Sequence, residues 1–299
     1  MSVSTSDRFS SRLKTLDEAP EPFRSTLLQH LSPQHHICLM VWGPASKTIR
    51  SKSQATLLTV TNRNWIVVSE AQDKCMTASV CDFVNTLSVE LTSILLLGRL
   101  SIDFAAEDGL QFAVIEFNTV MEQLYQEAIQ LLLDGMDGIS SEVLAEDKQE
   151  NIQLHELPLK SRNAVLEFKP RSQNILSVLH WSATFRGSSR WIQHELTPEA
   201  VLALTQRELM LISEEKAWSW IRAGYTRKYG KIVTYFPLVR LESFCLTGNR
   251  HLCALGLKIC SEHGGENRGV DFPRERETDV AAFMERAMRQ KMALKHHTQ

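Results

Sequence analysis

The feature of this sequence that most constrains its fold is a pattern that occurs twice, in segments 57–70 and 201–214. The two segments align without a gap at a spacing of 144 positions, which relates Thr61 to Thr205 and Arg63 to Arg207. Each consists of an apolar run, a short Thr-x-Arg turn and a second apolar run that ends in Ser-Glu. Two apolar runs around a polar turn are typical of a β-hairpin. The sequence therefore predicts the same hairpin twice, which indicates a duplicated architecture.

Weaker matches extend this repeat on both sides of the hairpin. Upstream, segment 23–33 precedes Ile37 and Trp42, while segment 159–170 precedes Ile175 and Trp181. Downstream, alternating runs around a glycine turn predict a further hairpin in each half. Apolar residues then recur at helical spacing, which predicts a final amphipathic helix in each half. The downstream matches are 100–104, 107–109 and 112–117 with 255–259, 263–265 and 269–272, and the helices are 120–132 and 280–288.

The connection between the two halves has the composition of a solvated linker. Gly135 and Gly138 can stop the first helix, and the following stretch, 142–150, is highly charged. We therefore expect two domains, 1–150 and 151–299. Lys and Arg number 11 in the first and 22 in the second, against 20 and 15 Asp and Glu, so the net charges are −9 and +7. Such opposed charge can draw an anionic ligand to the second half, or dock halves or successive protomers together.

A series of antiparallel strands with a Thr-x-Arg hairpin, ended by one amphipathic helix, resembles the bacterial pleckstrin-homology-like (PH-like) domain, here present twice. Segments 57–69 with 120–132, and 201–213 with 280–288, carry this resemblance. It implies an α+β, mainly β protein made of two tandem PH-like domains. Each would be a strongly bent antiparallel sheet, or open barrel, capped by its C-terminal helix. The resemblance also implies a binding or scaffolding role, because members of this type are mostly binding modules.

The most suggestive local segment for a ligand is 218–231, which combines four basic residues with four aromatic residues. Arginine and lysine can hold phosphates while aromatic rings stack on bases or lie at a lipid headgroup layer. The alternative is structural, with the tryptophans packed as strand residues and the cations keeping a loop tip soluble. The candidate ligand-binding residues are Trp218, Trp220, Arg222, Arg227, Lys228 and Lys231.

Sequence motifs for catalysis, metal binding and membrane insertion do not appear in this chain. There is no GxSxG, GxxxxGK[ST] or GxGxxG motif, and the six cysteines form no CxxC pair, so neither an enzyme nor a cofactor or metal site is expected. Free cysteines are commonly core residues, and we expect these thiols to be buried. No apolar run is long enough for a transmembrane segment or suited to a signal peptide, which predicts a cytoplasmic protein. A pI of about 6.6 argues against a dedicated nucleic-acid binder.

These patterns favour a non-catalytic protein that binds another protein or itself. The alternative function is peripheral binding of anionic lipid or of a phosphorylated ligand by the basic second half.

Overall fold

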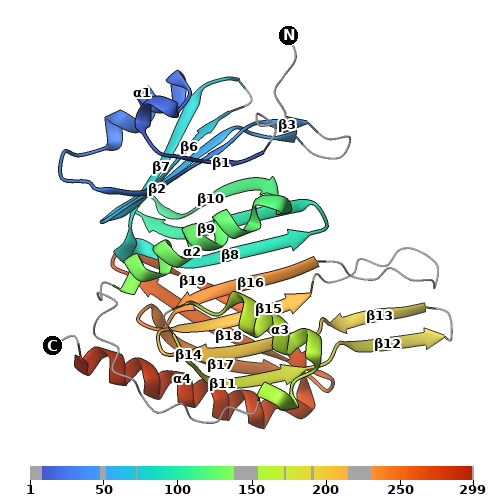
Figure 1. Ribbon diagram of the computed structural model, residues 1–299. Coiled ribbons are helices and arrows are strands. Elements are labelled where there is room, and N and C mark those ends of the chain that lie inside the picture. Colours follow the sequence, from blue (N-terminus) through green and yellow to red (C-terminus); the bar gives the residue numbers. More distant parts are fainter. Residues whose placement is uncertain are drawn as a thin grey trace.

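The computed structural model describes residues 9–47, 52–71, 73–137, 154–171, 173–189, 192–214 and 230–297. Within these ranges the chain is mainly β with several antiparallel sheets, as the sequence predicts, and it has four α-helices. None of the described sheets closes on itself. Figure 1 shows the sheets stacked along the molecule, with the last helix along the end that carries the C-terminus.

The first half begins with two elements that precede the repeated pattern of strands. A short strand and a helix come first, and the helix begins directly after Pro20, with Pro22 in its first turn, where a missing N–H costs nothing. The elements of this half are β1 Ser11–Leu13, α1 Glu21–His30, β2 Ile37–Gly43, β3 Ser46–Lys47, β4 Lys52–Ser53, β5 Thr56–Thr61, β6 Asn64–Glu70, β7 Met76–Asp82, β8 Thr86–Ile94, β9 Leu97–Ala106, β10 Gly109–Asn118 and α2 Glu122–Asp137.

The second half repeats this order of elements from its first helix onward. Its helix also follows a proline, Pro158. The elements are α3 Leu159–Phe168, β11 Ile175–Trp181, β12 Thr184–Ser189, β13 Ile192–Thr197, β14 Ala200–Thr205, β15 Glu208–Glu214, β16 Gly230–Pro237, β17 Leu241–Gly248, β18 Leu252–Ser261, β19 Gly264–Pro273 and α4 Glu277–His297.

Strand registers in the two halves agree in detail. Pairing of β5 with β6 matches pairing of β14 with β15 at an offset of 144, and every strand from β7 to β10 matches β16 to β19 at an offset of 155. A bulge follows the first residue of β8 and the first residue of β17 alike. The turn before β10 and the turn before β19 both place a glycine at positive φ, Gly109 and Gly264, where a side chain would be strained.

Hydrogen bonds outside the strand ladders agree as well. The backbone N–H of His36 bonds the Asn62 side chain at 2.9 Å, and that of Asn174 bonds the Gln206 side chain at 3.1 Å. Thr119 N–H bonds the carbonyl of Leu96 at 3.2 Å, just as Arg274 N–H bonds that of His251 at 3.4 Å. Equivalent positions therefore make equivalent irregular contacts.

The structure adjusts two matches that were drawn from sequence. Because β2 and β11 pair with equivalent strands, Trp42 corresponds to His180, and Trp181 corresponds to Gly43. Likewise Gly109 matches Gly264, one residue away from the sequence alignment. Identity of residue type misled the alignment in the first case, whereas the bulges and ladder partners fix the register.

The two halves are joined through a continuous seven-stranded sheet with the order β10-β9-β8-β16-β15-β14-β11. The joint is the antiparallel pair β8 and β16, in which Val89 faces Tyr235 and Ile94 faces Gly230. Strands β1, β2, β5, β6 and β7 form a separate sheet, and β17, β18 and β19 form another. The seven-stranded sheet thus contains strands from both sides of residue 150.

Three apolar clusters follow from this arrangement. The first fills the interior of the first half around α2 and continues under α3 onto the outer face of β14 to β16. The second fills the interior of the second half around α4. The third lies between α1 and the outer face of β5 and β6. The first cluster contains residues of both halves and spans the joint, because the inner face of β8 continues as the outer face of β16.

Candidate binding cleft

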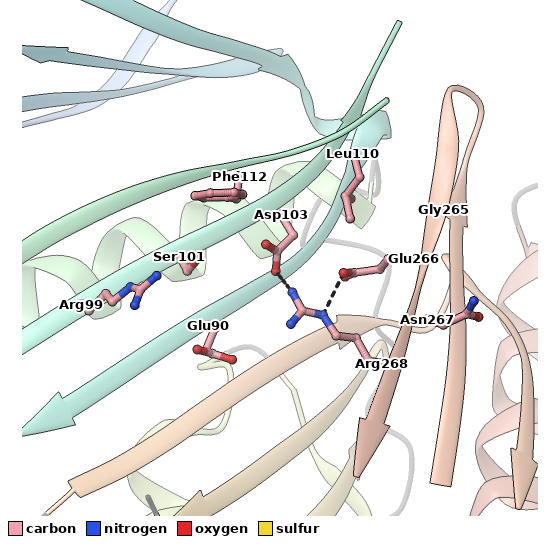
Figure 2. A pocket seen from close by; sticks show the side chains of 10 residues that line it. All are labelled: Glu90, Arg99, Ser101, Asp103, Leu110, Phe112, Gly265, Glu266, Asn267 and Arg268. Atoms are coloured by element: carbon pink, nitrogen blue, oxygen red, sulfur yellow. Dashed lines mark hydrogen bonds and ion pairs between the residues drawn. The ribbon is translucent and has the colours of Figure 1, made fainter. Parts of the chain in front are cut away.

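A hollow that gathers charged groups lies where the two halves meet, away from α2. Its floor is the outer face of β8, β9 and β10, and its wall is β19 of the second half, as Figure 2 shows. The cleft is shallow and open, with a volume of about 700 Å³. Its lining residues are Glu90, Arg99, Ser101, Asp103, Leu110, Phe112, Gly265, Glu266, Asn267 and Arg268.

At the centre of the cleft, Arg268 holds two carboxylates, one from each half of the chain. Its guanidinium contacts the Asp103 carboxylate, and its Nε lies 2.8 Å from Glu266 Oε2. Ser88 Oγ lies 2.8 Å from Asp103 Oδ2 and 3.2 Å from Glu266 Oε1. Because one hydroxyl carries one proton, Ser88 can donate to only one of these carboxylates at a time. The network ties β8, β9 and β19 together.

The two acidic groups of this network are poorly solvated. Side-chain exposure is 11% for Asp103 and 6% for Glu266, against 38% for Arg268. Burial raises the pKa of Glu266, with a further contribution from the Asp103 charge, although Arg268 opposes both. Burial alone would lower the pKa of Arg268, but Asp103 and Glu266 outweigh it and raise that pKa. A carboxyl with a raised pKa in a cleft can mark a functional site. Here the Glu266 carboxyl is already paired with Arg268 and hydrogen-bonded to Ser88.

The rim of the cleft is apolar and exposed. Phe112 is 68% exposed and Leu110 is 55% exposed, and both project from β10 toward the cleft. Arg99 is also exposed, and it forms no ion pair with any other described residue. Glu90 accepts a hydrogen bond from Thr234 at 3.2 Å. The cleft therefore offers one available cation next to two large apolar side chains.

The residues singled out from sequence lie elsewhere. Trp218, Trp220, Arg222, Arg227 and Lys228 fall in 215–229, outside the described residues. Lys231 lies on β16, where its ammonium is 2.9 Å from Glu167 Oε2 and 5.3 Å from the centroid of the Phe168 ring. The change of offset from 144 to 155 shows that the second half is longer than the first between β15 and β16. The residue equivalent to Lys231 in the first half is Met76, the first residue of β7.

Sequence analysis missed the cleft because its residues occupy ordinary positions on separate strands. Asp103 and Arg268 are far apart in the chain and meet only because β19 packs across β9 and β10. The only available signal was the exposed apolar pair Leu110 and Phe112 within an otherwise alternating run.

A second polar cluster is buried near α2 and involves the Thr-x-Arg turn of the second half. Arg207 Nη1 lies 3.1 Å from Asp137 Oδ2, and both side chains are 2% exposed. Burial and the Asp137 charge raise the pKa of the neighbouring Glu208 to about 8, and burial raises that of Asp137. Gln173 accepts from the Thr205 hydroxyl at 2.7 Å. The side chains of this cluster are almost entirely buried in the described structure.

The cysteines are less buried than expected. Cys81 and Cys253 are buried, whereas Cys38, Cys75 and Cys245 are exposed, and all are free. Strands β2 and β17 present Cys38 and Cys245 at alternate positions whose side chains face outward, which composition alone does not reveal. Across the described residues, no three His, Cys, Asp or Glu side chains are grouped closely enough to hold a metal ion.

No family model and no curated protein matches the chain. Among the helices of the described ranges, none is both long and apolar enough to cross a membrane.

Proposed function

We propose that this chain is a non-catalytic binding protein that recognises a polypeptide through the cleft between its halves. The observation that carries the proposal is the juxtaposition of exposed Phe112 and Leu110 with exposed Arg99, beside a network in which the Arg268 guanidinium engages two carboxylates. Large aromatic side chains and arginine are the residues that contribute most to protein interfaces. An open, shallow hollow suits a peptide backbone better than an enclosed small molecule.

The chemistry of the cleft defines the segment that it would bind. Asp103 and Glu266 are engaged by Arg268, so Arg99 is the cation left for a partner carboxylate. Phe112 lies opposite Asp103 on the neighbouring strand, and together with Leu110 it provides an apolar surface. A segment with an acidic side chain next to a large apolar one matches both features.

Selection from a random peptide library displayed on phage tests this proposal directly. Peptides selected on the full chain should be enriched in acidic residues next to large apolar ones. They should lose at least tenfold in affinity for Arg99→Ala and for Phe112→Ser, since each removes a central contact. Leu166→Ser is the matched control, because Leu166 is 49% exposed on α3, away from the cleft. Peptides that bind all three variants equally would contradict the proposal.

We further infer that the two halves are copies of one PH-like unit and that the protein is cytoplasmic. The repeated order of elements, the matching bulges and the matching irregular hydrogen bonds support duplication. In each half, strands equivalent to β2 and β5 to β10 precede a helix that packs on the interior, as in a PH-like arrangement. The alternative function, binding of anionic lipid or a phosphorylated ligand near Lys231, loses some support because Glu167 already neutralises that ammonium. A test is co-sedimentation with vesicles of phosphatidylcholine alone and with added phosphatidylserine.

A further inference from the structure

The joint between the halves uses one strand of each, and the equivalents of those strands lie at sheet edges. Strand β8 of the first half pairs with β16 of the second. The equivalent of β8 is β17, and the equivalent of β16 is β7. Within the described residues, β7 is the last strand of its sheet and β17 is the last strand of the other (Figure 1). The molecule therefore carries the two strands that a second joint of this kind would pair, and within one molecule the described structure leaves them unpaired with each other.

Burial changes accordingly between paired and unpaired equivalents. The last five residues of β16 are buried, whereas in β7 only Cys81 is buried. Most of β8 is buried, whereas in β17 only Leu241 is buried. Exposed strand edges with free N–H and C=O groups are templates for pairing with another chain.

The register of the internal joint predicts which residues would meet in the second one. Tyr235 faces Val89, and the equivalent residues are Val80 and Phe244. Val233 faces Leu91, and their equivalents are Ala78 and Leu246. Apolar side chains thus face apolar side chains, which is the arrangement that stabilises cross-strand pairs.

The polar residues of the two edges match in the same register. Ile232 faces Thr92 in the internal joint, and the equivalents are Thr77 and Thr247, both exposed. Thr234 faces Glu90, and the equivalents are Ser79 and Cys245, of which Cys245 is exposed. Small polar side chains of this kind pair across strands without burying a charge.

The apolar clusters are divided in the same way as the edges. One cluster spans the internal joint, where the interior of the first half continues under α3. At the unpaired edges, the equivalent apolar regions are the interior of the second half and the layer under α1. These two regions form separate clusters. Phe244 and Leu246 pack at the margin of one, and Met76 and Ala78 at the margin of the other.

We propose that copies of this chain associate head to tail, with β7 of one molecule paired antiparallel to β17 of the next. The contact reproduces the β8–β16 joint between molecules, and since it uses two different edges it leaves one of each free at the ends of every open assembly. The opposed net charges of the two halves favour this polarity over head-to-head pairing.

The joint between molecules is weaker than the joint within one. The internal joint is accompanied by the buried pair of Arg207 with Asp137. At a joint between molecules, the position of Arg207 is taken by Arg63, which is exposed, and the position of Asp137 by Met292. The position of Asp134 is taken by Arg289. Because this ion pair is missing, the association is reversible and depends on concentration.

A disulfide trap tests the register. Ser79→Cys places a thiol opposite Cys245 of the next molecule, and oxidation by diamide, which takes up two electrons and two protons, should link them. We expect a reducible ladder of multimers of the 34.0 kDa chain on non-reducing gels. The ladder should be lost in the double variant that combines Ser79→Cys with Cys245→Ser. It should be weaker in the single variant Val80→Cys, because residue 80 lies on the other face of β7. Cys38 and Cys75 are present in every variant and give the background.

A charge-swap pair tests the polarity without cysteine chemistry. Thr77 and Thr247 are exposed, so substitutions there spare the core. Thr77→Lys with Thr247→Lys sets like charges opposite each other, whereas Thr77→Lys with Thr247→Glu sets opposite charges. Sedimentation velocity should give a dissociation constant about tenfold higher for the first variant than for the second.

Each of three results would overturn the proposal. These are a wild-type monomer up to the highest soluble concentration with no ladder from Ser79→Cys, a ladder that persists without Cys245, and equal dissociation constants for the two charge variants. These residues lie outside the cleft around Arg99 and Phe112, so peptide binding and self-association can fail independently.

Discussion

The two Thr-x-Arg turns share one local structure but differ in their surroundings. In the first, Arg63 and Asn64 donate their backbone N–H groups to the Thr61 hydroxyl at 3.1 and 3.0 Å. In the second, Arg207 and Glu208 donate to Thr205 at 3.4 and 2.9 Å. A short-range side-chain bond therefore builds both turns. The arginine of the first is exposed, whereas that of the second is 1% exposed.

The difference arises from what packs on each turn. The end of α2 lies on the second turn, where Asp137 meets Arg207. Across the described residues, Arg63 forms no ion pair with an acid comparable to that of Arg207 with Asp137. The same tripeptide is thus a solvated turn in one half and part of a buried charge cluster in the other, so local sequence determines the turn while the joint of the halves determines the role of its arginine.

Replacing the two arginines should give the largest contrast. We expect Arg207→Met to lower the free energy of unfolding by about 3–5 kcal/mol, because it leaves the buried Asp137 without its partner. Arg63→Met should change it by less than about 0.5 kcal/mol, as is usual for an exposed side chain. Urea titrations of both variants measure this contrast. Equal losses would show that the second turn is not held by its ion pair.

Removing the threonine hydroxyls should give smaller and more similar effects. Thr61→Val and Thr205→Val each leave two backbone N–H groups of the turn without their acceptor, at a cost of about 1–3 kcal/mol. The loss should be greater at Thr205, whose hydroxyl also bonds Gln173. The same urea titrations apply. A negligible effect at Thr61 would mean that the first turn is held by its strands alone.

Glu208 should make stability depend on pH, whereas its equivalent, Asn64, cannot ionise. Because the folded protein raises the pKa of Glu208 from 4.5 to about 8, the folded state keeps a proton that the unfolded chain releases. Stability should therefore fall as pH rises between these values, by at most about 1.4 kcal/mol per pH unit for this one proton. The difference between wild type and Glu208→Gln, from urea titrations at pH 5 to 8, isolates this effect. A pH-independent difference would contradict a protonated Glu208.

Sequence was sufficient for features that depend on neighbours along the chain. The periodicity of 120–132 and 280–288 predicted α2 and α4, and the apolar runs around Thr61 and Thr205 predicted the hairpins β5–β6 and β14–β15. Helices α1 and α3 were not assigned, because their short stretches carry only a few apolar residues between prolines.

Features that depend on distant strands gave no readable signal. The β8–β16 joint has the same alternation as any sheet edge, since pairing uses backbone groups that every residue carries. Asp103, Glu266 and Arg268 form a network only after this joint and the packing of β19 have brought the halves together. Patterns along one strand cannot report such contacts.

The β8–β16 pairing also has a consequence during synthesis of the chain. Val89 on β8 cannot meet its partner Tyr235 until the ribosome has made more than half of the second half. Until then the first half carries an unpaired edge and an uncovered apolar surface, the conditions under which nascent chains aggregate or pair wrongly. Completion of the fold therefore waits on one late strand, so truncation within 215–237 should leave a product that is less soluble than the full chain.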